Sequence, residues 1–311
     1  MKTDAGDATE ALRAYRTDCQ PNFFTETRAR LGIEYEEPRG VCSTLFWPGC
    51  ALASYSQALT ESVYNWLRER GLADAMTARC CGNILAFSAA PHERQDFAAT
   101  LKGFFTAHGV RRVVTVCPNC FYGLRELMAD VLEVRILSDL LFEQGMRLTP
   151  ELLGARSVAI HDSCPDRRHG VIAASVRSLC EGLEIRELAH NRQHSLCCGL
   201  GKLLFITAPA ASERLRSGRL REFCDSGAEV LLCYCMSCAQ AFQYPARDGA
   251  NTAGGAGDDG AGDDGANTAD GVGGCGAAHD GANTAAPLRA LHYLEPLFDC
   301  SVDWAALRTD I

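Results

Sequence analysis

The sequence predicts an α/β protein made of two pseudo-symmetric domains, each with an open sheet of parallel strands. Short apolar, β-branched segments alternate with amphipathic segments along the chain, which is typical of parallel βαβ units. A set of five cysteines recurs in register in the second half, which indicates a duplicated unit. The 311 residues are enough for two domains with separate cores.

The first repeat is expected to alternate three strands with three helices. Its first two helices are each followed by a glycine, Gly71 and Gly109, as is common at helix C-termini. We predict strands over residues 41–46, 112–116 and 132–137, and helices over residues 54–70, 91–108 and 121–130. Before this repeat we expect a short helix near residues 8–16 and then a loop or arm.

The second half repeats this order of elements. We predict strands over residues 157–161, 184–188 and 229–233, and helices over residues 170–181 and 209–225. The end of the repeat is displaced, because residues 293–298 correspond to residues 136–141 at an offset of 157 residues instead of 118. About 39 residues are therefore inserted before the last strand.

The inserted segment, residues 246–287, has low complexity. It repeats Asp-Gly-Ala-Asn-Thr-Ala from Asp248, Asp264 and Asp280. Because it lacks apolar side chains that could offset its ordering entropy, we expect it to be disordered. The predicted organisation is an N-terminal arm over residues 1–40, a first domain over residues 41–150 and a second domain over residues 151–311 that contains the insertion.

Charge and hydropathy exclude several classes of protein. Of the net charge of −9, −6 lies in residues 246–287, and no basic stripe suggests nucleic acid. The apolar runs are shorter than the roughly 18 residues that span a bilayer, and the N-terminus has no apolar signal segment. We therefore expect a cytoplasmic protein without membrane insertion. Its 17 cysteines are then better explained by metal binding or redox chemistry than by a framework of disulfides.

Ten cysteines form the repeated constellation. Equivalent cysteines are separated by 114, 117, 117, 118 and 118 residues. Four of the ten follow predicted parallel strands, so their thiols should meet at the carboxyl edge of each sheet, beside helix N-termini that favour thiolates. The first set is Cys50, Cys80, Cys81, Cys117 and Cys120, and the second is Cys164, Cys197, Cys198, Cys235 and Cys238.

Three kinds of site compete for these thiols. Two Cys-x-x-Cys pairs could make a tetrahedral zinc site, and a strand ending in Cys117-Pro118-Asn119-Cys120 is similar to a thioredoxin-type dithiol. Neither site needs the vicinal pairs Cys80-Cys81 and Cys197-Cys198. A fifth thiolate is surplus for zinc or an ordinary cubane cluster, so five thiols in each repeat favour iron–sulfur chemistry.

The duplicated motif resembles the cysteine-rich (CCG) domain family, which includes the B subunit of heterodisulfide reductase. The resemblance rests on Phe46-Trp47-Pro48-Gly49-Cys50, on His161-Asp162-Ser163-Cys164-Pro165 and on the Cys-Cys-Gly and Cys-x-x-Cys motifs that follow each, over residues 42–243 and 288–300. It implies that each set of five cysteines holds a noncubane [4Fe-4S] cluster. It further implies that a disulfide or similar two-electron acceptor is reduced between the two clusters.

The resemblance also implies alternatives and partners. Related copies occur in lactate and glycolate oxidation systems, where the chain would be a non-catalytic electron-transfer subunit, and some relatives use zinc in one copy. The second repeat departs from the first at Met236, which replaces Pro118, and at an additional Cys233. No motif for a cubane cluster or for a bound nucleotide is present, so we expect a ferredoxin-like subunit and a flavoprotein subunit as partners.

Two further residues are candidates for catalysis. His161 and Asp162 precede the proposed ligand Cys164, and either could donate a proton to a thiolate product. A histidine at a strand end is more often structural. Cys233 lies close enough to the second set to matter, although we expect it to belong to the core.

Overall fold

The computed structural model describes residues 16–17, 20–88, 91–243 and 289–307. The predicted insertion at residues 246–287 lies outside these residues, and so does the predicted helix near residues 8–16 except for Arg16. Arg16 belongs to strand β1 (Arg16–Thr17), which pairs with β2 (Gln20–Pro21) in an antiparallel ribbon.

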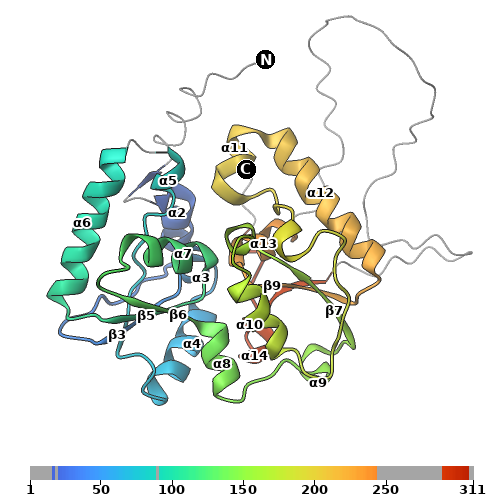
Figure 1. Cartoon of the computed structure of the whole chain (residues 1–311), viewed down its shortest axis with the longest axis horizontal. Coiled ribbons are helices and arrows are strands. Elements are labelled where there is room, and N and C mark those ends of the chain that lie inside the picture. Colours follow the sequence, from blue (N-terminus) through green and yellow to red (C-terminus); the bar gives the residue numbers. More distant parts are fainter. Residues whose placement is uncertain (1–15, 18–19, 89–90, 244–288, 308–311) are drawn as a thin grey trace, which may run out of the picture.

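Two parallel four-stranded sheets confirm the predicted fold class (Figure 1). Their strand orders are equivalent, β4-β3-β5-β6 in the first sheet and β8-β7-β9-β10 in the second. The strands of the first sheet are β3 (Thr44–Trp47), β4 (Ala75–Met76), β5 (Arg112–Thr115) and β6 (Glu133–Ile136). Those of the second sheet are β7 (Ser157–His161), β8 (Glu184–Ile185), β9 (Val230–Cys233) and β10 (Ala290–His292).

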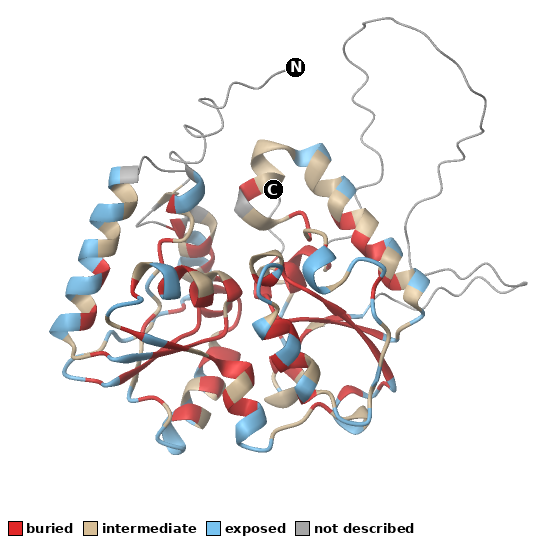
Figure 2. Ribbon diagram, viewed as in Figure 1, coloured by how far each residue is buried: buried red, intermediate tan, exposed pale blue. Residues whose placement is uncertain are grey.

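Helices cover both sheets, so the inner strands β3, β7 and β9 are buried along their whole length, and β5 is buried except at Arg112 (Figure 2). In and before the first repeat they are α2 (Asn22–Leu31), α3 (Cys50–Tyr55), α4 (Gln57–Glu69), α5 (Leu85–Ser88), α6 (Pro91–Ala107), α7 (Pro118–Leu127) and α8 (Leu137–Glu143). In the second repeat they are α9 (Pro150–Leu153), η1 (Cys164–Asp166), α10 (Val171–Leu179), η2 (Arg192–His194), η3 (Gly201–Leu203), α11 (Leu204–Thr207), α12 (Pro209–Ser226), α13 (Met236–Ala241) and α14 (Leu294–Leu297).

Three sequence-based boundaries need correction. The helix predicted over residues 54–70 is divided at Ser56, which is extended and accepts a hydrogen bond from Leu59 N at 3.1 Å, so it caps a new helix. The strand predicted over residues 184–188 is limited to Glu184–Ile185. The expected arm before residue 40 contains the helix α2, whose sequence has little apolar periodicity.

The two repeats pack directly against each other. α8 contacts α10, α3 contacts α13, and α7 contacts η1. Buried hydrogen bonds cross this interface, from Ser175 Oγ to Ser138 Oγ at 2.7 Å and from the Tyr55 hydroxyl to the Gln240 side chain. One hydrophobic core therefore extends through both repeats, and the carboxyl edges of the two sheets are neighbours.

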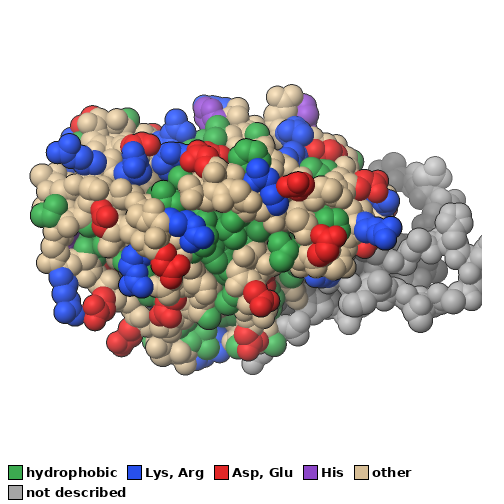
Figure 3. All heavy atoms as spheres, turned by 90° about the horizontal axis from the view of Figure 1, so that it is seen from below, with side chains coloured by type: hydrophobic (Ala, Val, Ile, Leu, Met, Phe, Trp, Pro, Cys, Tyr) green, Lys and Arg blue, Asp and Glu red, His purple; other side chains and the backbone are tan. Residues whose placement is uncertain are grey.

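The surface is mixed in charge. On the face seen in Figure 3, acidic and basic side chains are interspersed, and apolar side chains are visible towards its middle. Within the described residues, no helix combines the length and the apolar character needed to cross a membrane.

We predict that residues 246–287 can be replaced by a short Gly-Ser linker. The described residues on either side are already close, because Gln243 Nε2 donates a hydrogen bond to Ala290 O at 2.6 Å. Each halving of loop length recovers only about 0.6 kcal/mol of closure entropy, so the melting temperature should stay constant or rise by a few degrees. Calorimetry and metal analysis of the shortened chain test this expectation, and a fall in metal content would contradict it.

Candidate metal centre

The first thiol cluster is built by loops after three neighbouring strands. Cys50 begins α3 after β3, Cys80 and Cys81 follow β4, and Cys117 caps α7 after β5. Cys120 lies in the first turn of α7. The thiol of Cys80 contacts those of Cys50 and Cys81, and the thiol of Cys120 contacts those of Cys81 and Cys117. All five predicted residues of the first repeat are thus brought together.

A glycine allows this close approach. Gly49 has φ 84°, and a Cβ atom at this position would lie 2.6 Å from Cys117 Cβ. Any larger residue would push the loop before α3 away from the loop before α7. Gly49 therefore permits Cys50 and Cys117 to face the same site.

The second thiol cluster repeats this construction. Cys164 begins η1 after β7, Cys197 and Cys198 lie in the loop that follows β8, and Cys235 caps α13 after β9. The thiol of Cys197 contacts those of Cys164 and Cys198. The thiol of Cys238 contacts those of Cys198 and Cys235. The structure therefore brings together the five predicted residues of the second repeat as well.

Hydrogen bonding favours a thiolate in each cluster. The thiols of Cys120 and Cys80 donate to Cys81 and hold its pKa well below the ordinary value, despite burial. In the second cluster the Cys164 thiol, the Cys198 thiol and the backbone N–H groups of Gly199 and Gly201 lower the pKa of Cys197 to about 2. Each cluster is consequently prepared to bind a cation through sulfur.

The two clusters lie close to the interface between the repeats. The helix that begins at Cys50 packs against the helix that carries Cys238, and the helix that carries Cys120 packs against the turn that begins at Cys164. Tyr122 of α7 strengthens this contact, because its hydroxyl binds Asp166. The geometry therefore places two thiol sites beside each other across one interface.

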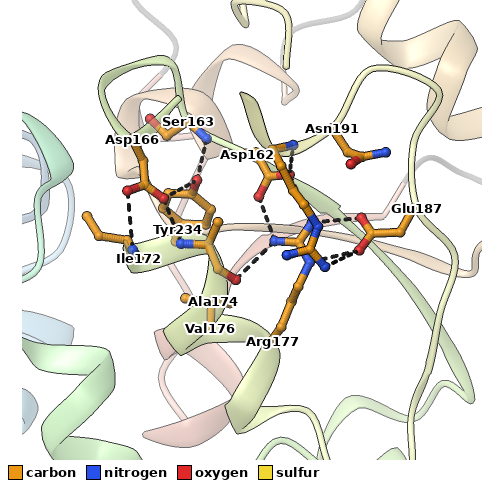
Figure 4. Close-up of polar contacts among 12 residues, drawn as sticks. Asp162, Ser163, Asp166, Ile172, Ala174, Val176, Arg177, Glu187, Asn191 and Tyr234 are labelled. Carbon is orange, nitrogen blue, oxygen red and sulfur yellow. Dashed lines mark hydrogen bonds and ion pairs between the residues drawn. The ribbon is translucent and has the colours of Figure 1, made fainter. Parts of the chain in front are cut away.

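Asp162 is held by a buried ion-pair network (Figure 4). Its carboxylate accepts hydrogen bonds from Arg177 Nη1 at 2.7 Å, from Arg177 Nη2 at 2.8 Å and from Arg192 N at 2.6 Å. Arg177 also pairs with Glu187 at 2.7 Å. These contacts tie the segment before Cys164 to α10 and to the loop after β8, which favours a positioning role for Asp162.

His161 is buried beside the second cluster. Desolvation lowers its pKa to about 3, with a contribution from nearby Arg219, so the imidazole is neutral at pH 7. A neutral imidazole of this kind is a poor proton donor. The predicted catalytic role of His161 and Asp162 stays a prediction.

Two more residues adjoin the second cluster. Cys233 is completely buried in the core, as expected. A thiolate at this position would interact electrostatically with Cys198 and Cys235. Arg219 on α12 is also completely buried near this cluster, and the sequence analysis missed it. Alignment of the helices beginning at Pro91 and Pro209 could have found it, since Arg219 then stands opposite the apolar Leu101.

Comparison with protein families now identifies the repeats. The cysteine-rich domain family, CCG, matches the chain twice, at residues 44–125 and 158–243, which together are more than half of its length. The chain belongs to this family. Its cysteine-rich domains and their thiol clusters indicate binding of a metal ion or an iron–sulfur group.

Other comparisons add little. No curated protein matches the chain. Among solved structures it is similar to a putative Asp/Glu racemase from Yersinia pestis, with 12% identity, coverage of 63% of this chain and 86% of that chain, and a TM-score of 0.33. An aspartate racemase homologue from Pyrococcus horikoshii gives 10% identity, coverage of 64% and 87%, and a TM-score of 0.29. Such scores support no conclusion about function.

We predict that the two centres can be removed separately. Cys81→Ser should abolish metal binding in the first repeat and leave the second intact, and Cys198→Ser should do the reverse, because each cluster is built from one repeat. Metal content per chain and the absorption spectrum of each variant measure this. Loss of both centres from either single change would indicate one shared site.

We also predict a structural effect of Arg177→Met. Removal of the guanidinium leaves the buried Asp162 carboxylate without its ion-pair partner, which should cost about 3 kcal/mol of unfolding free energy. Denaturant titration measures the loss. Arg186→Met is the matched control, since its pair with Glu184 is exposed and its loss should change the unfolding free energy much less. Equal effects of the two changes would contradict this assignment.

Proposed function

We propose that the chain is an iron–sulfur oxidoreductase subunit similar to the B subunit of heterodisulfide reductase. The observation that carries this proposal is the pair of five-thiol clusters beside one interface. Cys50, Cys80, Cys81, Cys117 and Cys120 would hold one [4Fe-4S] cluster, and Cys164, Cys197, Cys198, Cys235 and Cys238 the other. Five thiols exceed the four that a zinc ion takes, which supports noncubane clusters in both repeats.

The residues around the two thiol clusters are suited to iron–sulfur groups. Both clusters collect several thiols in a partly dry site, where backbone N–H groups of Asn83, Gly199 and Gly201 offset negative charge. Apolar residues of the core surround the buried members and limit access of water. These features stabilise an anionic iron–sulfur group against solvent attack.

A cavity of about 550 Å³ could admit a small substrate to the first thiol cluster. Cys80 lies in its wall, with Phe97 and Phe104 from α6. Arg28, Glu37 and Arg79 also line the cavity. Glu37 pairs with Arg79 at 2.8 Å, whereas Arg28 binds the neutral Ser54 hydroxyl at 3.1 Å, so Arg28 could bind the anionic group of a molecule with an apolar part. A small-molecule disulfide that carries carboxylates or phosphates belongs to this class.

The proposed reaction is reductive cleavage of a disulfide. When bound, the two iron–sulfur groups supply electrons one at a time. The S–S bond breaks, two electrons and two protons are taken up, and two thiols are released. The electrons come from a reduced ferredoxin-like partner that is itself supplied by a flavoprotein, and the protons come from water. The chain's own residues bind and orient the disulfide and shield the reacting sulfurs.

We predict roughly eight irons and a similar amount of acid-labile sulfide per anaerobically purified chain. The reconstituted chain should accept electrons from a reduced viologen and release thiols from a small anionic disulfide, but it should not oxidise NADH. Iron, sulfide and zinc analysis, followed by a thiol assay, measures both parts. Cys81→Ser and Cys198→Ser are the controls for thiol release.

The outcomes discriminate between functions. Zinc without sulfide would refute the cluster assignment and favour a zinc-stabilised module. Clusters that are reduced by the viologen but release no thiol would favour an electron-transfer subunit of a lactate- or glycolate-type oxidase. Disulfide reduction driven by NADH alone would refute the need for partner subunits.

A further inference from the structure

The two thiol clusters have different neighbours at equivalent positions. In the first sheet Trp47 pairs in register with Thr115, and in the second sheet His161 pairs in register with Cys233. The strand that leads to the first cysteine of each repeat therefore ends with an indole in one repeat and an imidazole in the other. Trp47 packs against Phe105 as part of the apolar core.

His161 is presented to the second cluster as a ligand would be. A ring nitrogen of His161 and the sulfur atoms of Cys198 and Cys238 all lie within 4.8 Å of one another. The side chain is 1% exposed, and neither ring nitrogen has a hydrogen-bonding partner among the described residues. Phe242 packs edge-on against the ring at 5.0 Å and fixes its orientation.

A buried imidazole without partners is costly, because nearly all buried polar atoms in proteins are hydrogen-bonded. A metal beside Cys198 and Cys238 would satisfy one nitrogen, and imidazole and thiolate together are common ligands of iron and zinc. We propose that His161 supplies a nitrogen ligand to the second metal centre, whereas the first centre is bound by sulfur alone.

Arg219 is a second difference between the two centres, because it places a positive charge near the second one. It is fully buried and donates hydrogen bonds to Glu222 Oε2 at 2.6 Å and to His190 O at 2.7 Å. Its positive charge also acts on Cys238. The equivalent position on α6 is Leu101, which is buried and uncharged.

The charge of Arg219 should raise the reduction potential of the second centre relative to the first, because a buried cation stabilises the more negative, reduced state. This consequence rests on the proposed function, because it takes both centres to be iron–sulfur groups. The second centre would then hold an electron more tightly than the first.

Pulsed electron paramagnetic resonance on the reduced, anaerobically reconstituted full chain tests the proposal. His161→Phe keeps a ring against Phe242 and removes both nitrogens. We expect strong nitrogen coupling in the wild-type signal, a change of that coupling on labelling with [¹⁵N]histidine, and its loss in His161→Phe. Identical nitrogen couplings in wild type and variant would overturn the proposal.

Three further variants keep the test decisive. His92→Gln removes an exposed histidine from α6 of the first repeat and should change nothing. Arg219→Met should lower the potential and leave the nitrogen coupling intact, which separates the charge from the ligand. If His161→Phe does not fold, His161→Gln replaces it, and loss of metal from the second centre alone also supports ligation.

A result that refutes the proposed function can be distinguished from one that refutes ligation by His161. If the chain contains zinc and no sulfide, that function fails, and X-ray absorption at the zinc edge decides the present inference. A nitrogen scatterer at about 2.0–2.1 Å that disappears in His161→Phe supports ligation by His161. A spectrum with sulfur scatterers alone overturns it.

Discussion

Both metal centres depend on the fact that parallel strands end at the same edge of a sheet. The loops after β4, β3 and β5, three adjacent strands, supply the five thiols of the first repeat, and the loops after β8, β7 and β9 supply those of the second. Adjacent strands lie about 4.8 Å apart, so cysteines about 70 residues apart in sequence come within contact distance. A change of strand order would disperse them.

This convergence has an energetic cost that the surrounding structure offsets. Several buried thiols compete for charge, and the pKa is strongly lowered for Cys81 in the first cluster and for Cys197 in the second. Backbone N–H groups, tight glycine turns and the packing between the repeats keep the sites assembled. Bound metal would neutralise the remaining thiolates, so metal binding and stability should be linked in this fold.

Much of this arrangement could be predicted from the sequence. The register of the cysteines and the periodicity of the strands gave the fold class and the membership of each thiol cluster. The break at Ser56 and the helix α2 were missed, because a local cap and tertiary packing outweigh a weak periodic pattern there. Arg219 was missed because its burial depends on tertiary packing of α12, including a contact with the carbonyl of His190, which is distant in sequence.

Duplication explains the symmetry of the scaffold, and a few substitutions explain how the two halves can differ in chemistry. The sheets share their strand order and the register of their central strand pair, but His161 and Arg219 stand where Trp47 and Leu101 stand in the first repeat. Identical centres would have equal potentials and no preferred direction of electron flow. In the proposed arrangement, a buried charge beside one centre would separate the two potentials without any change of fold, because a charge acts strongly at short range in a dry site.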